Sequence, residues 1–147
     1  MIGDDVVCRA WSRGTRVLIG AVDAALAQID LTAAEYEILN ALTTTCSLRM
    51  VDLARQAVLT KSGATRAVQH LEAQGLVERR GSGSDRRSFV ISLTASGHER
   101  HREGQRLIEA TLRELLLEFT SPRDRETLVR IYGDVVAERE ANGCDAQ

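Results

Sequence analysis

The spacing of apolar residues changes abruptly between residues 76 and 93, and this change limits the possible folds. Residues 60–74 have apolar side chains at the spacing of one helical face. Residues 89–93 (FVISL) instead alternate between two faces, as in a half-buried strand. The glycine- and serine-rich stretch 81–85 precedes that strand and is typical of a turn. We therefore expect a β-hairpin inserted between helices.

The rest of the chain is predicted to be helical. It contains one proline, and its aromatic content of 3% favours helix-on-helix packing over a β-sandwich. Thr32 with Glu35 forms a capping box. Thr60 and Thr94 are further N-caps, and Gly75 suits a left-handed helix end. The expected helices are 5–29, 33–45, 49–57, 61–74, 95–119 and 122–141.

These elements form one predicted domain. No repeat or low-complexity linker divides the 147 residues, of which 44% are hydrophobic and 27% charged. Two short helices joined by a tight turn and followed by a hairpin form a winged helix-turn-helix. The expected fold is therefore mainly α with a small β-hairpin wing. The core spans residues 31–94, and long dimerisation helices occupy 1–30 and 95–147.

Two features predict a cytoplasmic protein with no membrane contact. Residues 17–29 are the longest apolar stretch near the N-terminus, but polar residues interrupt them and they are too short to span a bilayer. The three cysteines, Cys8, Cys46 and Cys144, are scattered and odd in number, which argues against a disulfide framework and for a reducing compartment.

The distribution of charge indicates a polyanionic partner. The net charge of the chain is −2, which by itself does not suggest nucleic acid. Residues 49–87 contain 8 basic and 4 acidic side chains, whereas the remainder contains 11 basic and 17 acidic ones. A basic middle between acidic ends is typical of a localised DNA footprint, although an ordinary solvated surface would also give this pattern.

The helix at 61–74 has a polar face opposite its apolar stripe. Every side chain of that face can donate a hydrogen bond and none is a carboxylate, which suits the major groove of DNA. We expect Arg66 and Gln69 to read bases, the serine and threonine hydroxyls to hold phosphates, and Arg86 to make the main wing contact. The expected DNA-binding residues are Lys61, Ser62, Thr65, Arg66, Gln69, His70, Arg79, Arg80, Ser84, Asp85, Arg86 and Arg87.

The same region resembles the MarR family of bacterial regulators (multiple antibiotic resistance regulator type). The resemblance covers about residues 10–140, and its most specific parts are Leu-Glu-x-x-Gly-Leu-Val at 71–77, Asp-Arg-Arg at 85–87 and Leu-Thr-x-x-Gly at 93–97. It implies a winged-helix homodimer with a helix in the major groove and a wing arginine in the minor groove. It also implies a pseudo-palindromic operator, usually bound by a repressor that a small ligand or oxidation releases.

Apolar residues outside the core independently predict a homodimer. The three-helix DNA-binding core by itself cannot cover three further apolar stripes, so we expect them to be buried across the two-fold axis of a dimer. A long helical bundle within one chain is the alternative. Such a dimer sets its two DNA-reading helices about 34 Å apart, near one turn of DNA. The stripes are Val7, Trp11 and Leu18; Leu107, Ile108, Leu112, Leu115, Leu116 and Phe119; and Leu128, Ile131, Tyr132, Val135 and Val136.

Cys8 and Trp11 on the first helix are the candidate sensor residues. The place of Cys8 is similar to that of the reactive cysteine in the hydroperoxide-sensing branch of the family. That branch has activating tyrosines where this chain has Ser12, Val22 and Ala33, so a bystander cysteine is favoured. Trp11 is a candidate for lining a cleft that takes an aromatic or phenolic effector, with ordinary packing as the alternative.

No cofactor, metal or catalytic site is expected. His98 and His101 have a spacing that could ligate a metal, but the helix is rich in competing arginines and a solvated face is favoured. Cys46 is expected to pack at a helix end. No phosphate-binding loop or nucleophile motif is recognisable, so the chain is not expected to be an enzyme.

The sequence thus predicts a sequence-specific regulator of transcription that binds double-stranded DNA, acting as a homodimeric repressor released by a small ligand. Two alternatives stay open. One is a redox-sensing regulator that uses Cys8, and the other is a winged-helix dimer that binds proteins and not DNA. A steep salt dependence of binding to duplex DNA would exclude the second alternative.

Overall fold

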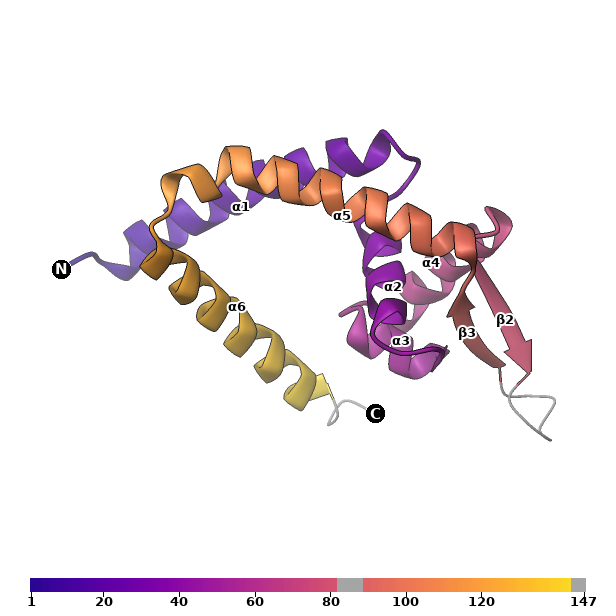
Figure 1. Ribbon diagram of the computed structural model, residues 1–147. Coiled ribbons are helices and arrows are strands. Elements are labelled where there is room, and N and C mark those ends of the chain that lie inside the picture. Colours follow the sequence, from indigo (N-terminus) through magenta and orange to yellow (C-terminus); the bar gives the residue numbers. More distant parts are fainter. Residues whose placement is uncertain (82–88, 144–147) are drawn as a thin grey trace.

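The computed structural model describes residues 1–81 and 89–143. It confirms the expected fold class, because helices dominate and a hairpin separates the fourth helix from the fifth (Figure 1). The elements are α1 (Asp4–Ala27), α2 (Ala33–Thr43), β1 (Leu48–Arg49), α3 (Met50–Gln56), α4 (Lys61–Ala73), β2 (Val77–Gly81), β3 (Phe89–Leu93), α5 (Ala95–Leu115), the 3-10 helix η1 (Leu117–Phe119) and α6 (Pro122–Gly143).

Helices α2, α3 and α4 and the sheet share one hydrophobic core. The expected apolar stripes of α2 and α4 are buried there together with the last turn of α1. Strand β3 lies between β1 and β2 in an antiparallel sheet, and both hairpin strands extend from the far end of α4 (Figure 1). The largest fully buried side chains are Leu26, Ile38, Leu39, Leu53, Leu71, Ile91 and Val68.

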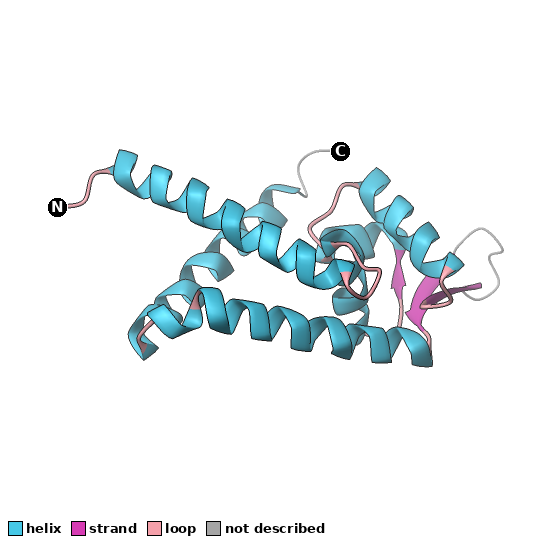
Figure 2. Ribbon diagram, turned by 90° about the horizontal axis from the view of Figure 1, so that it is seen from above, coloured by secondary structure: helices cyan, strands magenta, loops and turns pink. Residues whose placement is uncertain are grey.

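Helices α1 and α5 pack along each other and extend away from this core, as both views show (Figures 1 and 2). Helix α6 turns back at the far end of α5 and runs apart from the other helices (Figure 1). Over residues 122–139 every side chain of α6 is exposed except Leu128, which is half-buried. Within the described protomer, α6 therefore lacks the packing that normally stabilises a helix.

The local signals for helix ends are confirmed. The Thr32–Glu35 capping box is complete, since Thr32 Oγ1 accepts from the amide of Glu35 and Glu35 Oε2 accepts from the amide of Thr32. Thr60 caps α4 and Gly75 follows that helix with a φ of +69°. These features depend on residues within one helical turn, which is why the sequence reveals them.

The backbone differs from the prediction in two places. The sequence gives no sign of β1, because its two residues are too few to show alternation and they form a strand only by pairing with β3. The long helix was expected to continue to Phe119. The α-helix instead ends at Leu115, and Leu116, with a φ of −131°, leads into η1.

Two side-chain expectations were also wrong. Cys46 does not pack, because the helix ends before it and leaves it exposed. His101 is buried and not solvated: its Nε2 lies 3.1 Å from Asn40 Oδ1, and its ring stacks on Tyr36 with centroids 5.3 Å apart. Both partners come from α2, so only the packing of α5 on α2 could reveal this environment. In the part of the chain that the structure describes, no helix is long and apolar enough to cross a membrane.

Candidate nucleic-acid interface

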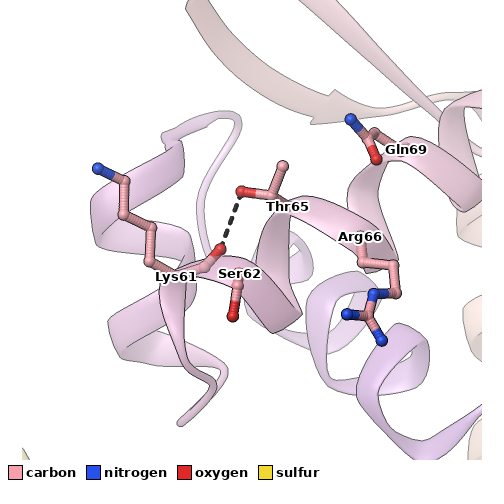
Figure 3. A pocket seen from close by; sticks show the side chains of 5 residues that line it. All are labelled: Lys61, Ser62, Thr65, Arg66 and Gln69. Atoms are coloured by element: carbon pink, nitrogen blue, oxygen red, sulfur yellow. Dashed lines mark hydrogen bonds between the residues drawn. The ribbon is translucent and has the colours of Figure 1, made fainter.

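One face of α4 anchors the helix and the opposite face is open to solvent. Ala64, Ala67, Val68 and Leu71 are buried in the core. Five predicted DNA-binding residues, Lys61, Ser62, Thr65, Arg66 and Gln69, project together from the other side and line a shallow hollow (Figure 3). We call these five residues the α4 surface. None of them carries a negative charge.

Hydrogen bonds within the α4 surface decide which groups remain available to a ligand. Thr65 Oγ1 donates to the carbonyl oxygen of Lys61 at 2.8 Å, so its hydroxyl hydrogen is already used (Figure 3). Ser62 Oγ lies 3.3 Å from the capping hydroxyl of Thr60. Lys61 and Arg66 make no ion pair with any residue the structure describes. The cations of this surface are therefore free to meet phosphates.

His70 lies beside the α4 surface but does not line the hollow. Its Nδ1 is 2.5 Å from Oε1 of Glu35, a buried residue of α2. The side chain of His70 is nevertheless 56% exposed. Sequence reasoning missed this partner because it assigned Glu35 only to the capping box with Thr32.

The predicted wing arginines that the structure describes are both ion-paired. Arg79 Nε lies 3.0 Å from Glu72 Oε2, so the one carboxylate of α4 meets the base of the wing. Arg80 pairs with Glu78 on its own strand. Exposed pairs of this kind stabilise the fold by only about 0–1 kcal/mol, so a phosphate can displace them. Ser84, Asp85, Arg86 and Arg87 lie outside the described residues.

A second hollow of about 710 Å³ lies between α1, α2, the end of α5 and α6. Its wall is mostly apolar, with Asp23, Glu37, Arg125 and Tyr132 among the polar contributions. Desolvation raises the pKa of the Glu37 carboxyl, and a hydrogen bond with Asn40 partly offsets this effect.

Arg125 is held at this hollow by η1 and the residue that follows it. Its guanidinium donates to the carbonyl oxygen of Leu117 at 2.8 Å and to Thr120 Oγ1 at 3.2 Å. Trp11 is 61% exposed and does not line this hollow. Cys8 is exposed on the first turns of α1. Among the described residues, no group of His, Cys, Asp and Glu side chains is arranged to hold a metal.

A donor-rich helix packed on two further helices, with a three-stranded antiparallel wing beside it, defines a winged helix-turn-helix domain. Comparison with known proteins agrees. The model of the MarR family matches residues 29–88. The HTH-type transcriptional repressor Rv2887 of Mycobacterium tuberculosis is 33% identical over 110 residues, which are 75% of this chain and 79% of that protein.

Solved structures share the whole architecture. Sco3205, a MarR family transcriptional regulator from Streptomyces coelicolor solved in complex with DNA, matches with a TM-score of 0.82 and 26% identity over 94% of this chain and 89% of that one. AbsC, a MarR family regulator from the same organism, matches with a TM-score of 0.79 and 26% identity over 100% and 99% of the two chains. This protein belongs to the MarR family of transcriptional regulators.

Proposed function

We propose that this protein is a homodimeric, sequence-specific DNA-binding repressor that acts in the cytoplasm as a single domain. The observation that carries the proposal is the α4 surface, where two cations without a described ion-pair partner and three polar side chains stand together without a carboxylate. Such a surface is complementary to the edges and phosphates of a major groove. The repressor Rv2887 and the DNA complex of Sco3205 support this interpretation.

The proposed residues divide into two groups by their environment. Lys61 and Arg66 carry charge that no described carboxylate neutralises, so they are the main phosphate or base contacts of the helix. Arg79 and Arg80 must first leave Glu72 and Glu78 to reach DNA. We therefore expect Arg79 and Arg80, together with Arg86, to add affinity for DNA beside the contact that α4 makes.

Dimerisation through the terminal helices would cover the unpartnered apolar surface. Large apolar residues are exposed along both α1 and α6, and exposed apolar surface of this kind is typical of an interface. Two copies related by a two-fold axis would bury both helices and present two α4 surfaces to an operator of matching symmetry. These residues are Val6, Val7, Trp11, Val17, Ile19, Val129, Ile131, Tyr132, Val135 and Val136.

The hollow between α1, α2, α5 and α6 is the proposed site for a small effector. Its apolar wall suits an aromatic ring, and the guanidinium of Arg125 is available to a carboxylate or phenolate. Because both α2 of the DNA-binding core and α6 of the dimer helices line it, a ligand there would bias their relative placement. Trp11 lies outside this site in the protomer.

The DNA-binding proposal is tested by measuring affinity for the DNA that flanks the protein's own gene over a series of salt concentrations. Arg66→Ala should weaken binding and reduce the slope of log affinity against log salt by about 1 for each phosphate that the variant no longer neutralises. Arg86→Ala should have the same kind of effect. Arg106→Ala, which removes an exposed charge from α5, is the control. If Arg66→Ala behaves like this control, α4 is not the reading helix.

The redox alternative is tested in the same assay. Cys8 is exposed, but no basic or tyrosine side chain among the described residues forms a hydrogen bond to it that would favour the thiolate. Binding should therefore survive moderate peroxide. Loss of binding that Cys8→Ser prevents would establish redox sensing instead.

A further inference from the structure

Glu35 is the buried carboxylate at the junction of α2 with α4. Only 5% of its surface is exposed, although it lies in the first turn of α2. Its Oε2 accepts from the amide of Thr32 at 2.8 Å, and its Oε1 lies 2.5 Å from Nδ1 of His70. Capping explains the first contact. It does not explain why the second oxygen faces a side chain 35 residues further along the chain.

The pairing fixes the orientation of the imidazole. A buried carboxylate must have hydrogen-bond donors, because its desolvation is otherwise very costly. The oxygens of an ionised carboxylate can only accept, so with Glu35 ionised Nδ1 of His70 is the donor of this contact. With Nδ1 protonated, the neutral ring has a free lone pair on Nε2. Glu35 therefore selects both the plane of the ring and its tautomer.

The remaining nitrogen is available at the edge of the α4 surface. Nε2 is the ring nitrogen farther from the backbone, and within residues 1–81 and 89–143 it has no hydrogen-bond partner. His70 directly follows Gln69 and stands one helical turn after Arg66, both of which line the hollow of α4. With α4 in the major groove and the imidazole neutral, DNA would thus meet an acceptor at this place, beside the donors of Arg66 and Gln69.

We propose that Glu35 is a positioning residue for DNA recognition, which holds His70 so that Nε2 accepts a hydrogen bond from the exocyclic amino group of an adenine or cytosine. This inference rests on the proposed function, because it assumes that α4 enters the major groove. Those amino groups are the donors that the major groove presents. His70 thereby adds an acceptor to a surface whose other long side chains are mainly donors.

Two variants separate the two nitrogens of His70. His70→Asn keeps an amide nitrogen near the position of Nδ1 that can donate to Glu35, and it removes Nε2. Glu35→Gln keeps the capping box, since glutamine serves there as well as glutamate, but it turns an amide donor or a neutral oxygen toward Nδ1. Both variants should therefore fold, which thermal denaturation of each protein checks.

The measurement is a double-mutant cycle on operator affinity. Each single variant should bind the operator about tenfold more weakly, the value of one hydrogen bond, while binding to unrelated duplex DNA stays unchanged. The double variant should be no weaker than His70→Asn, because both changes remove the same contact. Replacing each operator base pair in turn should show that both variants lose discrimination at the same A·T or G·C pair.

The tautomer gives an independent readout. Nitrogen-15 spectra of the imidazoles should show the Nδ1-protonated form for the neutral ring of His70 in the wild type and a shift toward the Nε2-protonated form in Glu35→Gln. A merely structural role of Glu35 would not move this signal.

Each outcome is decisive. The inference is overturned if His70→Asn binds the operator like the wild type, or if Glu35→Gln weakens binding equally in the His70→Asn background. It is also overturned if both variants weaken binding to all DNA alike, since His70 would then contact phosphate. A wild-type protein that binds no DNA would instead refute the proposed function, so the two failures are distinguishable.

Discussion

The carbonyl oxygen of Leu76 occupies the place where any residue other than glycine at position 97 would have its Cβ atom. A Cβ built on Gly97 would lie 2.0 Å from that oxygen and 3.0 Å from its carbonyl carbon. Thr94, the cap of α5, donates to the carbonyl oxygen of Gly75 at 2.7 Å beside it. The first turn of α5 therefore packs directly against Gly75 and Leu76, which link α4 to the wing.

We predict that Gly97→Ala destabilises the protein by about 3 kcal/mol, because backbone atoms cannot move aside as a flexible side chain can. Chemical denaturation measures the free energy of unfolding. Gly14→Ala is the matched control, since a Cβ there meets nothing within 4 Å, and it should stabilise helix α1 by about 0.5–1 kcal/mol. Equal stability of the two variants would show that α5 does not approach the α4–β2 link this closely.

The proposed dimer predicts that a charge on the apolar stripe of α6 produces monomers. Ile131 and Val135 are 45% and 61% exposed in the protomer, so Ile131→Glu or Val135→Glu leaves the core intact. In the dimer the introduced carboxylate would be buried between the two copies, and the cost of burying its charge would strongly disfavour association. Sedimentation equilibrium measures the mass in solution. Ala137→Glu, on another face of α6, should remain dimeric, and a dimeric Val135→Glu would exclude α6 from the interface.

His101 makes the stability of the protein depend on pH. Burial, and secondly the charge of His98, lower the pKa of His101 below its ordinary value of 6.5. The unfolded chain therefore binds a proton more readily than the folded one. The resulting stabilisation is complete above about pH 6.5 and is lost as the pH falls toward the lowered pKa of the folded state.

The free energy of unfolding should thus decrease between about pH 7.5 and 5.5. His101→Gln should reduce this slope, whereas His98→Gln should keep most of it, because burial is the larger cause of the shift. A slope unaffected by His101→Gln would show that another group is responsible. The Glu37 carboxyl, whose pKa is raised, acts at lower pH and with the opposite sign.

The ion pair of Glu72 with Arg79 predicts a variant with increased affinity for DNA. Glu72→Gln removes the carboxylate that pairs with Arg79 and leaves the Arg79 guanidinium free to meet phosphate. Affinity for unrelated duplex DNA should rise severalfold, and the salt slope should steepen by about 1 if Arg79 contacts a phosphate. Glu126→Gln on α6 makes the same change in net charge and should have little effect. Equal affinities of the two variants would place Arg79 away from DNA.

Much of the fold followed from short-range information. The caps at Thr32, Thr60 and Thr94 and the left-handed Gly75 depend on hydrogen bonds to the next turn or on one backbone angle. The α4 surface follows from helical periodicity alone, since residues opposite a buried stripe must face outward. Strand β3 followed from alternation in the same way, and β2 was expected as its partner in the hairpin.

The sequence by itself determined where helices begin, which side of α4 is polar, and to which family the chain belongs. Only the tertiary structure decided what those polar groups meet. Glu35 holds His70, Glu72 holds Arg79, and Asn40 of α2 meets His101 of α5. The physical reason is that capping and periodicity act within about one turn of helix, whereas these pairings join residues on different elements and form only when the elements pack.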